Sequence, residues 1–307
     1  MADAIEPFFS VIIPVYNRAH TVGEAIRSVL AQTCQDFEIV VVDDGSTDDP
    51  ASAIAAFCDP RIHYIRQPNR GGGAARNAGI GHARGQFIAP LDSDDQFLPH
   101  HLETMKAMLA GTSKTVGYAR MVVDRGGGRT LVKPPRAIAP GEHMATYLLC
   151  DRGFVPTITV VVPTAMARQV RYHESLRYAE DTDFAIRLYL AGCKFVMAEA
   201  AGAVWKDMPD PNRSSAGRKG VRLIGWLEDL RPVIPPAAYY GARGWVIAKG
   251  VATTDKWAAL KMYLTALRHG CYAPRLAAIV FLQIFLSDRA YRLVADRAIG
   301  AVKTKTA

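Results

Sequence analysis

Short apolar runs alternate with helical patterns through the first hundred residues. Apolar residues spaced three and four apart predict an amphipathic helix over residues 22–30, and an Ala- and Gly-rich helix is predicted near Ala74 to Ala83. Strands that alternate with helices of this length indicate a mostly parallel sheet built from βαβ units. The apolar runs that predict its buried strands are Phe9 to Pro14, Glu38 to Val42, Ile62 to Ile65 and Phe87 to Leu91.

The pattern continues less regularly after residue 100. We expect His100 and His101 to begin a helix, Gly126 to Gly128 to form a turn, and two more strands to complete a mixed sheet. These two strands are Thr115 to Val123 and Ile158 to Val162.

Three carboxylates, Asp92, Asp94 and Asp95, follow directly after the fourth predicted strand. Ligands of open α/β sheets bind at the carboxyl ends of the strands. Adjacent acids repel one another, and a divalent cation with a phosphorylated ligand would neutralise them, since Mg²⁺ and Mn²⁺ prefer carboxylates and phosphates. The alternative is an acidic turn that caps the next helix.

The ends of the first two strands are also polar. Pro14 to Arg18 follow the first strand, and Asp43 to Asp48 follow the second. Asp43 and Asp44 can offer carboxylates to the N–H groups of a base. The alternative is a turn in which Thr47 or Asp48 caps the next helix.

A glycine-rich stretch, Asn69 to Gly79, leads into the Ala-rich helix. Free backbone N–H groups at a helix start favour an anion. The stretch is neither a P-loop nor a dinucleotide fingerprint, because the third glycine of the latter would fall at Arg76. Arg76 lies one turn into the helix, where it could reach a diphosphate.

Taken in order, these segments resemble the motifs of family 2 glycosyltransferases, which are inverting enzymes with the GT-A fold. The similarity extends over roughly residues 8–200 and rests on Pro14–Arg18, Val42–Asp48, Gly72–Gly79 and Asp92–Asp95. It implies an α/β fold, the GT-A fold, with a mostly parallel central sheet flanked by helices; the helical spacing of the C-terminal third adds a helical C-terminal extension. It also implies a Mn²⁺ or Mg²⁺ cofactor, with Asp94 as the metal ligand. The nucleotide-sugar-binding residues that it implies are Pro14, Val15, Tyr16, Arg18, Asp43, Asp44, Arg76, Asp92, Ser93 and Asp94.

The resemblance also implies a catalytic base. An inverting transfer needs a group that takes a proton from the acceptor hydroxyl. By resemblance this group is Asp181, and Glu180 and Asp183 support the acceptor pocket. The alternative is that Thr182 and Asp183 cap the helix that follows.

The chain departs from the family pattern in one place. Many relatives have a metal-binding His after the base region, but the corresponding stretch here, Val204 to Ser215, has none. Lys206 could contact phosphate and Asp207 could replace the missing ligand. Residues 209–217 are typical of either a mobile loop or a plain linker. The Gln-x-x-Arg-Trp motif of processive synthases is absent, which favours transfer of a single sugar.

Composition adds expectations about the setting of the protein. No N-terminal signal is evident near Asp3 and Glu6, and the five scattered cysteines form no Cys-x-x-Cys pair. We therefore expect reduced thiols and a cytoplasmic protein, and we exclude a disulfide framework.

Charge separates the C-terminal region from the rest. Residues 212–307 contain 16 Lys and Arg against 5 Asp and Glu, a net +11, so the remainder is −3 within the total of +8. We predict a GT-A domain over residues 1–211 and a basic, helical accessory region over residues 212–307. Leu276 to Leu286 is apolar but too short to span a bilayer. With Arg289, Arg292 and Arg297 after it, this segment predicts a helix that packs on the protein or lies at the inner face of a membrane.

The expected function is metal-dependent, inverting transfer of one sugar from a nucleoside diphosphate donor, of the UDP-linked kind, to a hydroxyl. The acceptor would be a glycan or a lipid-linked molecule, and the oligomeric state stays open. A nucleotidyltransferase would need a glycine-rich basic loop after the first strand, where Pro14 to Asn17 stand. Another alternative is a sugar-nucleotide-binding protein without turnover. A nucleic-acid-binding protein is not expected, because no such motif is present.

Overall fold

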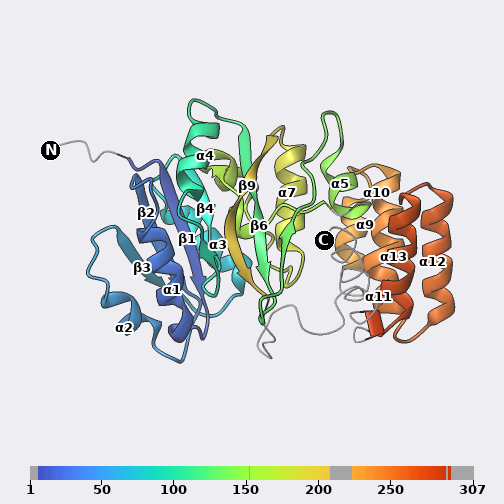
Figure 1. Ribbon diagram of the computed structural model, residues 1–307, viewed down its shortest axis with the longest axis horizontal. Coiled ribbons are helices and arrows are strands. Elements are labelled where there is room, and N and C mark those ends of the chain that lie inside the picture. Colours follow the sequence, from blue (N-terminus) through green and yellow to red (C-terminus); the bar gives the residue numbers. More distant parts are fainter. Residues whose placement is uncertain (1–5, 152, 208–222, 288–289, 292–307) are drawn as a thin grey trace, which may run out of the picture. The chain divides into compact units, whose positions relative to one another are not determined.

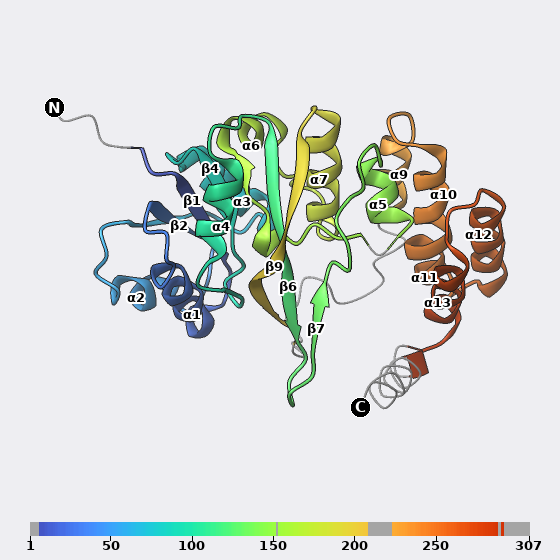
Figure 2. The same cartoon turned by 45° about the horizontal axis from the view of Figure 1, so that its top comes forward.

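The computed structural model describes residues 6–151, 153–207, 223–287 and 290–291. These residues divide into two compact units, which Figures 1 and 2 show from two directions. The first unit comprises residues 6–140 and 153–207, and the second comprises residues 141–151 together with the described residues from 223 onward. The sequence did not indicate that residues 141–151 pack with the second unit. The domain boundary expected at residue 211 lies outside the described residues and stays a prediction.

The first unit is built on a five-stranded sheet of order β3-β2-β1-β4-β8. β1 pairs in parallel with both β2 and β4, β2 pairs in parallel with β3, and β8 is antiparallel to β4. The mostly parallel sheet predicted from the sequence is therefore confirmed, and the ends of β1, β2 and β4 meet at one edge. The strands are β1 (Phe9–Val15), β2 (Phe37–Asp43), β3 (Ile62–Arg66), β4 (Phe87–Pro90) and β8 (Val162–Pro163).

Helices cover both faces of this sheet, because alternate residues of a strand point to opposite faces. Ile39 and Val41 of β2 belong to the core that contains the apolar stripe of α1 (Ala19–Leu30). Val40 and Val42 of β2 pack instead against Ala75 of α3 (Gly72–His82). The strands are apolar on both sides for this reason. α2 (Pro50–Ala55) lies against α1.

A glycine lets α3 approach β1 closely. A Cβ built on Gly79 would lie 2.5 Å from Cγ2 of Ile12, whose side chain is fully buried. We expect Gly79→Ala to destabilise the protein by about 1–3 kcal/mol, because the core would have to move. Gly81 is the matched control in the same helix, since a Cβ there meets no atom within 4 Å. Gly81→Ala should leave the unfolding free energy unchanged or raise it by up to about 1 kcal/mol. Denaturant unfolding of both variants measures the difference; equal effects would contradict the close approach.

A second sheet of order β5-β9-β6-β7 completes the first unit. β9 pairs in parallel with β6 and antiparallel with β5, so β5 links the segment after β4 to this sheet. The predicted helix after His100 and the turn at Gly126 to Gly128 are both present. The further elements are β5 (Gln96–Phe97), α4 (His101–Leu109), β6 (Thr115–Asp124), β7 (Thr130–Lys133), α6 (Thr164–Val170), α7 (Glu180–Leu190) and β9 (Lys194–Lys206).

The strand expected over Ile158 to Val162 is wrong in most of its length. Thr157–Thr159 form a 3-10 turn, and only Val162 at the end of the prediction belongs to a strand. The Thr159 hydroxyl donates to the Ala119 carbonyl at 2.8 Å and accepts from the Ala119 N–H at 3.2 Å. Within this segment, backbone pairing with β6 is limited to Val161, which bridges Gly117 through hydrogen bonds of 2.7 and 2.9 Å.

The second unit is helical. α12 and α13 lie side by side in both views. Leu276, Val280 and Ile284 of α13 are buried in the core of this unit, so the apolar run after residue 276 packs on the protein on that side. No described helix has the length and apolar character needed to cross a membrane. The elements are α5 (Met144–Leu149), α9 (Ile224–Leu230), α10 (Pro236–Ala242), the π-helix η2 (Arg243–Ile247), α11 (Ala248–Val251), α12 (Lys256–Arg268) and α13 (Pro274–Phe285).

Candidate active site

The turns after β1 and β2 are bonded to each other. Asn17, which has a left-handed φ of 52°, accepts the Thr47 N–H on its side-chain oxygen at 2.9 Å. The Ser46 hydroxyl accepts the Asn17 N–H at 3.0 Å. Asp44 continues the contact, because its N–H donates to the Val15 carbonyl at 2.8 Å. Two of the predicted nucleotide-binding segments are thus one local structure.

Tyr16 is the most accessible residue of the segment from Pro14 to Arg18. Tyr16 is 51% exposed and follows directly after β1, while Val15 is buried and Pro14 half-buried. An exposed aromatic ring at the carboxyl edge of a parallel sheet can stack on a nucleobase. Val15 can contribute only its backbone.

Asp43 is used within its own turn. Its side chain is fully buried and accepts the Ser46 N–H at 2.8 Å and the Tyr64 hydroxyl at 2.7 Å. Burial alone would raise the pKa of Asp43, but the hydrogen bonds from Ser46 and Tyr64 outweigh it and the pKa is lowered. Asp43 is therefore an ionised acid that holds the turn after β2.

Asp44 holds the glycine-rich stretch. Its two oxygens accept from Gln67 at 2.7 Å, from the Arg70 N–H at 2.9 Å and from the Gly71 N–H at 2.7 Å. Asp44 therefore fixes the segment that leads into α3, and the anion expected at the first turn of α3 itself stays a prediction. An ionised carboxylate has about four acceptor positions, so these three bonds leave one, on a residue that is 3% exposed.

The acidic segment after β4 has two inward-held residues and two more accessible ones. Ser93 and Asp95 are buried, and Asp95 accepts the Lys206 N–H at 2.9 Å, which joins this segment to the end of β9. Asp92 and Asp94 side chains are 34% and 35% exposed. The Arg18 guanidinium lies 3.8 Å from Asp94, so a predicted residue of the first turn reaches this segment.

Arg76 joins the acidic segment to the region of the predicted base. Its guanidinium donates to Asp92 at 2.6 Å and to Glu180 at 3.4 Å. Burial alone would lower the pKa of Arg76, but the charge of Asp92 and the other neighbours raises it, so this buried group is a permanent cation. Two motifs far apart in sequence thus meet at one side chain.

Sequence reasoning missed the residues that support Arg76. The Tyr172 ring lies 5.4 Å from the Arg76 guanidinium and stacks on Phe184 of α7 at 4.1 Å. The Asn77 side chain bonds both the N–H and the carbonyl of Tyr172, at 2.8 and 2.9 Å. Asn77 stands in the motif beside Arg76, but nothing near Tyr172 in the sequence signals this contact.

Asp181 lies in the first turn of α7 beside Glu180. Its carboxylate accepts the Thr182 N–H at 2.7 Å. Burial and the neighbouring charge of Glu180 raise the pKa of Asp181 to about 6, while Arg76 acts in the opposite direction. A carboxylate with a pKa this close to neutrality suits a general base.

Asp183 differs from its two acidic neighbours. It is 2% exposed, and Arg187 of the same helix donates to its carboxylate from two nitrogens. Glu180 is therefore the more accessible of the two residues predicted to support an acceptor pocket, and the role of both stays a prediction.

The helix caps proposed as alternatives are wrong. The N-cap of α7 is Ala179 in a left-handed conformation with no side-chain bond, so neither Thr182 nor Asp183 caps it. Asp49 caps α2 by accepting the Ser52 N–H at 3.3 Å, in place of Thr47 or Asp48. Asp48 instead accepts the Ala19 N–H, at the start of α1, at 2.8 Å.

The two residues considered as substitutes for the missing His are already bonded. Lys206 donates from its ammonium to Glu24, and Asp207 lies 3.4 Å from Arg125. The loop expected over residues 209–217 lies outside the described residues.

The acidic segment fits a metal only together with a ligand. In the described part of the chain, no three His, Cys, Asp or Glu side chains are placed to hold an ion. Mg²⁺ and Mn²⁺ are commonly bound by one or two carboxylates plus phosphate oxygens. Asp94 with Asp92 fits that pattern, because both side chains reach solvent at the end of β4.

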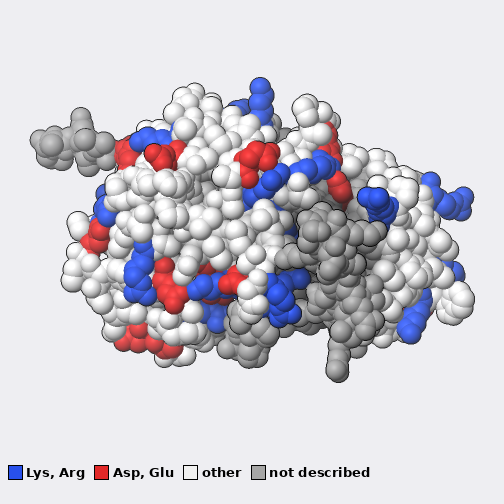
Figure 3. Space-filling model, in the orientation of Figure 1, with Lys and Arg blue, Asp and Glu red and all other residues white. Residues whose placement is uncertain are grey.

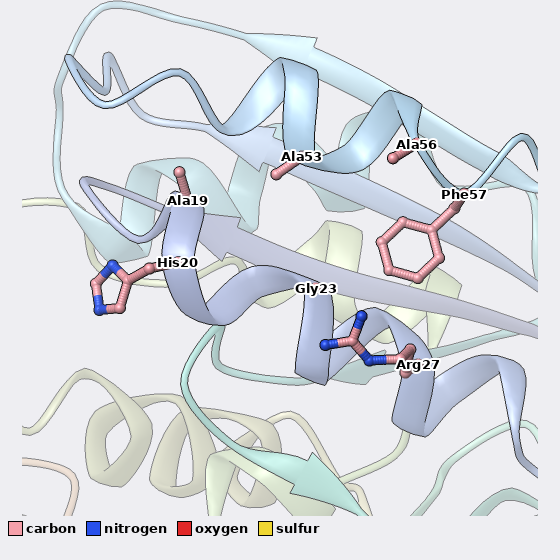
Figure 4. Close-up of a pocket in the computed structure, with 7 residues that line it drawn as sticks. All are labelled: Ala19, His20, Gly23, Arg27, Ala53, Ala56 and Phe57. Atoms are coloured by element: carbon pink, nitrogen blue, oxygen red, sulfur yellow. The ribbon is translucent and has the colours of Figure 1, made fainter.

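A hollow of about 300 Å³ lies elsewhere on the first unit, between α1 and the end of α2 (Figure 4). Arg27 lies 5.9 Å from the Phe57 ring in its wall. None of the predicted site residues lines it. The lining residues are Ala19, His20, Gly23, Arg27, Ala53, Ala56 and Phe57.

Several curated proteins are similar to the chain. The succinoglycan biosynthesis protein ExoO of Rhizobium meliloti (strain 1021) is 32% identical over 220 residues, 65% of this chain and 60% of that protein. The amylovoran biosynthesis glycosyltransferase AmsB of Erwinia amylovora is 26% identical over 234 residues, 73% of this chain and 78% of that protein. An uncharacterized glycosyltransferase of Rickettsia conorii is 55% identical over 96 residues, but these are 16% of its length. The chain thus spans less than two thirds of some of these relatives.

Solved structures show the same fold. TarS of S. aureus, in complex with UDP-GlcNAc, superposes with a TM-score of 0.61 at 21% identity, covering 92% of this chain and 87% of that one. The mannosyltransferase PcManGT of Pyrobaculum calidifontis, in complex with GDP-Man and Mn²⁺, gives 0.53 at 17% identity, covering 97% and 81%.

The motifs, the fold and the similar proteins all indicate the same family. The model of Glycosyl transferase family 2 matches residues 10–177, more than half of the chain, and the resemblance inferred from the sequence is confirmed. The chain belongs to glycosyl transferase family 2.

Proposed function

We propose that the chain is an inverting glycosyltransferase that moves one sugar from a UDP-linked donor to a hydroxyl acceptor. The observation that carries this proposal is the Arg76 bridge, which joins Asp92 at the end of β4 to Glu180 beside Asp181. A donor diphosphate at the acidic segment and an acceptor hydroxyl at Asp181 would then meet in one place. The relatives named for polysaccharide biosynthesis and the nucleotide-sugar complexes of the structural neighbours support the same reading.

The proposed reaction is a direct displacement. The Asp181 carboxylate takes the proton of the acceptor hydroxyl while the hydroxyl oxygen attacks the anomeric carbon from the side opposite the diphosphate. The new glycosidic bond forms as the bond from the anomeric carbon to the phosphate oxygen breaks, so the configuration inverts. The nucleoside diphosphate leaves with the electron pair of the broken bond.

The remaining residues bind and orient the donor in this proposal. Tyr16 stacks on the base, and Asp44 accepts a base N–H at its free position. Arg76 supplies a fixed positive charge beside the diphosphate, which stabilises charge that develops on the leaving group. Asp94 and Asp92 would hold Mn²⁺ or Mg²⁺, whose chemistry when bound is to neutralise the diphosphate as a Lewis acid.

Release of nucleoside diphosphate from a panel of sugar nucleotides tests the proposal. Water can replace the acceptor in slow hydrolysis, so the acceptor need not be known. We expect UDP release from one donor with Mn²⁺ or Mg²⁺ and at least about a tenfold loss with EDTA, because the acidic segment needs a cation to accept a diphosphate. Calorimetry should show weak binding of Mn²⁺ alone and tighter binding with UDP.

The other outcomes of this assay discriminate between the candidates. The protein could bind UDP and yet release none from any sugar nucleotide, even when glycans from a cell extract are added as acceptors. This result would indicate a binding protein without turnover. Absence of both binding and release would exclude the proposed donor site. Release that is unaffected by EDTA would contradict the metal role of Asp94.

The pH dependence of release reports on the base. Asp181 acts in its ionised form, and its pKa is raised to about 6. The rate should therefore be low below pH 6, rise about tenfold per pH unit there, and become constant above about pH 7. A rate at saturating donor that does not change between pH 5 and 8 would contradict this assignment.

A further inference from the structure

The second unit exposes large apolar side chains on α12 and α13. Trp257, Leu264 and Leu267 of α12 are 75%, 48% and 36% exposed, and Phe281 of α13 is 42% exposed. The Tyr263 and Phe281 rings lie 5.6 Å apart, so Phe281 lies on the flank of α12 that carries Tyr263. Single exposed apolar residues are ordinary, but several of them on one helix mark an interaction surface.

Helical spacing puts cations among these apolar residues. Trp257, Lys261, Leu264 and Arg268 are spaced four, three and four apart, so they form one stripe of α12. All four are exposed, whereas Ala259, Tyr263 and Ala266 on the opposite side are buried. The stripe is therefore amphipathic in itself, with alternating apolar and basic side chains.

Positive charge prevails on this surface. Residues 256–287 contain no Asp or Glu, and Lys256, Lys261, Arg268 and Arg275 are all exposed. The exposed acid Asp255 caps the start of α12. Figure 3 shows Lys and Arg, and no Asp or Glu, on the visible face over α12 at the right of the view. A second copy of the chain is a poor occupant, because a twofold interface would place these cations against themselves.

We propose that this α12 face, defined by Trp257, Lys261, Leu264 and Arg268, docks on an anionic lipid surface. The apolar side chains enter the boundary between head groups and acyl chains, and the Lys and Arg side chains bind lipid phosphates. Trp suits that boundary because its ring is apolar and its N–H is polar. The proposal does not rest on the donor site, since none of these residues belongs to it.

Vesicle co-sedimentation of the full chain tests the proposal. Wild-type protein should bind vesicles of phosphatidylcholine with phosphatidylglycerol, bind phosphatidylcholine alone weakly, and lose binding as NaCl is raised. Lys261→Gln with Arg268→Gln should weaken binding about 25-fold, because each charge near an anionic surface contributes about fivefold to the affinity. Trp257→Gln with Leu264→Gln should weaken it about tenfold or more. Fluorescence of Trp257, obtained as the difference from Trp257→Phe, should shift to the blue on anionic vesicles.

The matched control removes two charges elsewhere. Lys114 and Lys194 are exposed and belong to the first unit, so Lys114→Gln with Lys194→Gln should bind vesicles like the wild type. All variants should unfold at the wild-type temperature and release UDP at the wild-type rate. Vesicle binding that the face variants retain, or no binding by the wild type, would overturn the proposal. So would a dimer, or a complex with single-stranded RNA, that the face variants abolish without any vesicle binding.

Discussion

Asp181→Asn should lower the rate of UDP release about 10³-fold and leave the affinity for UDP within about threefold of the wild type. The amide has the size of the carboxylate but cannot take the acceptor proton, and general base catalysis contributes about 10²–10⁴. Apart from Arg76 of α3, the donor-binding residues lie at the ends of β1, β2 and β4 and in the turns after them, and Asn keeps the size of the Asp181 side chain, so the substitution leaves them in place. Single-turnover release and calorimetry with UDP and Mn²⁺ measure the two quantities separately.

A matched substitution controls for the loss of a carboxylate. Asp59→Asn makes the same atomic change in the same unit, at a residue whose carboxylate bonds Arg61 at 2.8 Å near β3 and lies outside the site. Asp59→Asn should keep the wild-type rate. The small residual rate of Asp181→Asn should also lose the rise through pH 6. If Asp181→Asn turned over normally, the base would have to be another group.

The strand ends of the first unit could be predicted because buried parallel strands give strong patterns. Residues of β1 and β2 face helices on both sides, so they are apolar without alternation, and the polar residues that follow are conspicuous. Pro14, Asp44 and Asp92 were placed at the edge of the sheet for this reason. The topology then brings these turns together, because the ends of adjacent parallel strands share one edge.

The partners of these residues could not be predicted. Nothing in the pattern of residues 43–48 says that Asp44 accepts the Gly71 N–H, since that bond joins two loops. The link from Arg76 to Glu180 spans 104 positions and depends on how α7 packs. The N-cap preferences of Asp and Thr also gave the wrong cap for α7. Its N-cap is Ala179, in a left-handed conformation that Ala rarely adopts.

Prediction from the sequence was also incomplete for the second unit. Hydrophobic spacing predicted a helix after residue 276 but left open whether it packs or lies on a membrane. The structure separates the two faces: Val280 is buried and Phe281, the next residue, is exposed. Packing explains one side of α13 only, and the lipid proposal rests on the exposed stripe of the neighbouring helix α12.

Arg76→Met should both destabilise the protein and shift the pH profile of release. The change leaves Asp92 and Glu180 without their shared cation. Breaking a fully buried ion pair costs about 3–5 kcal/mol, and we expect about 2 kcal/mol here because both carboxylates partly reach solvent. Arg76 also opposes the rise in the pKa of Asp181, so its removal should move the midpoint of the rate profile above pH 6. The rate at high pH should fall about 10²-fold through lost charge stabilisation.

The shift of the pH midpoint distinguishes an effect of Arg76 on the pKa of Asp181 from a role in stability alone. Arg168→Met is the matched control, because Arg168 bonds the Ala83 carbonyl at 2.6 Å at the end of α3 and no carboxylate among the described residues. It should lower the unfolding free energy without moving the pH midpoint. Arg76→Lys keeps the charge but not the planar fork that reaches two carboxylates, so it should restore the midpoint more fully than the rate. A midpoint that stays at pH 6 in Arg76→Met would show that Arg76 does not act on Asp181. The bridge between the two motifs would then serve the fold alone.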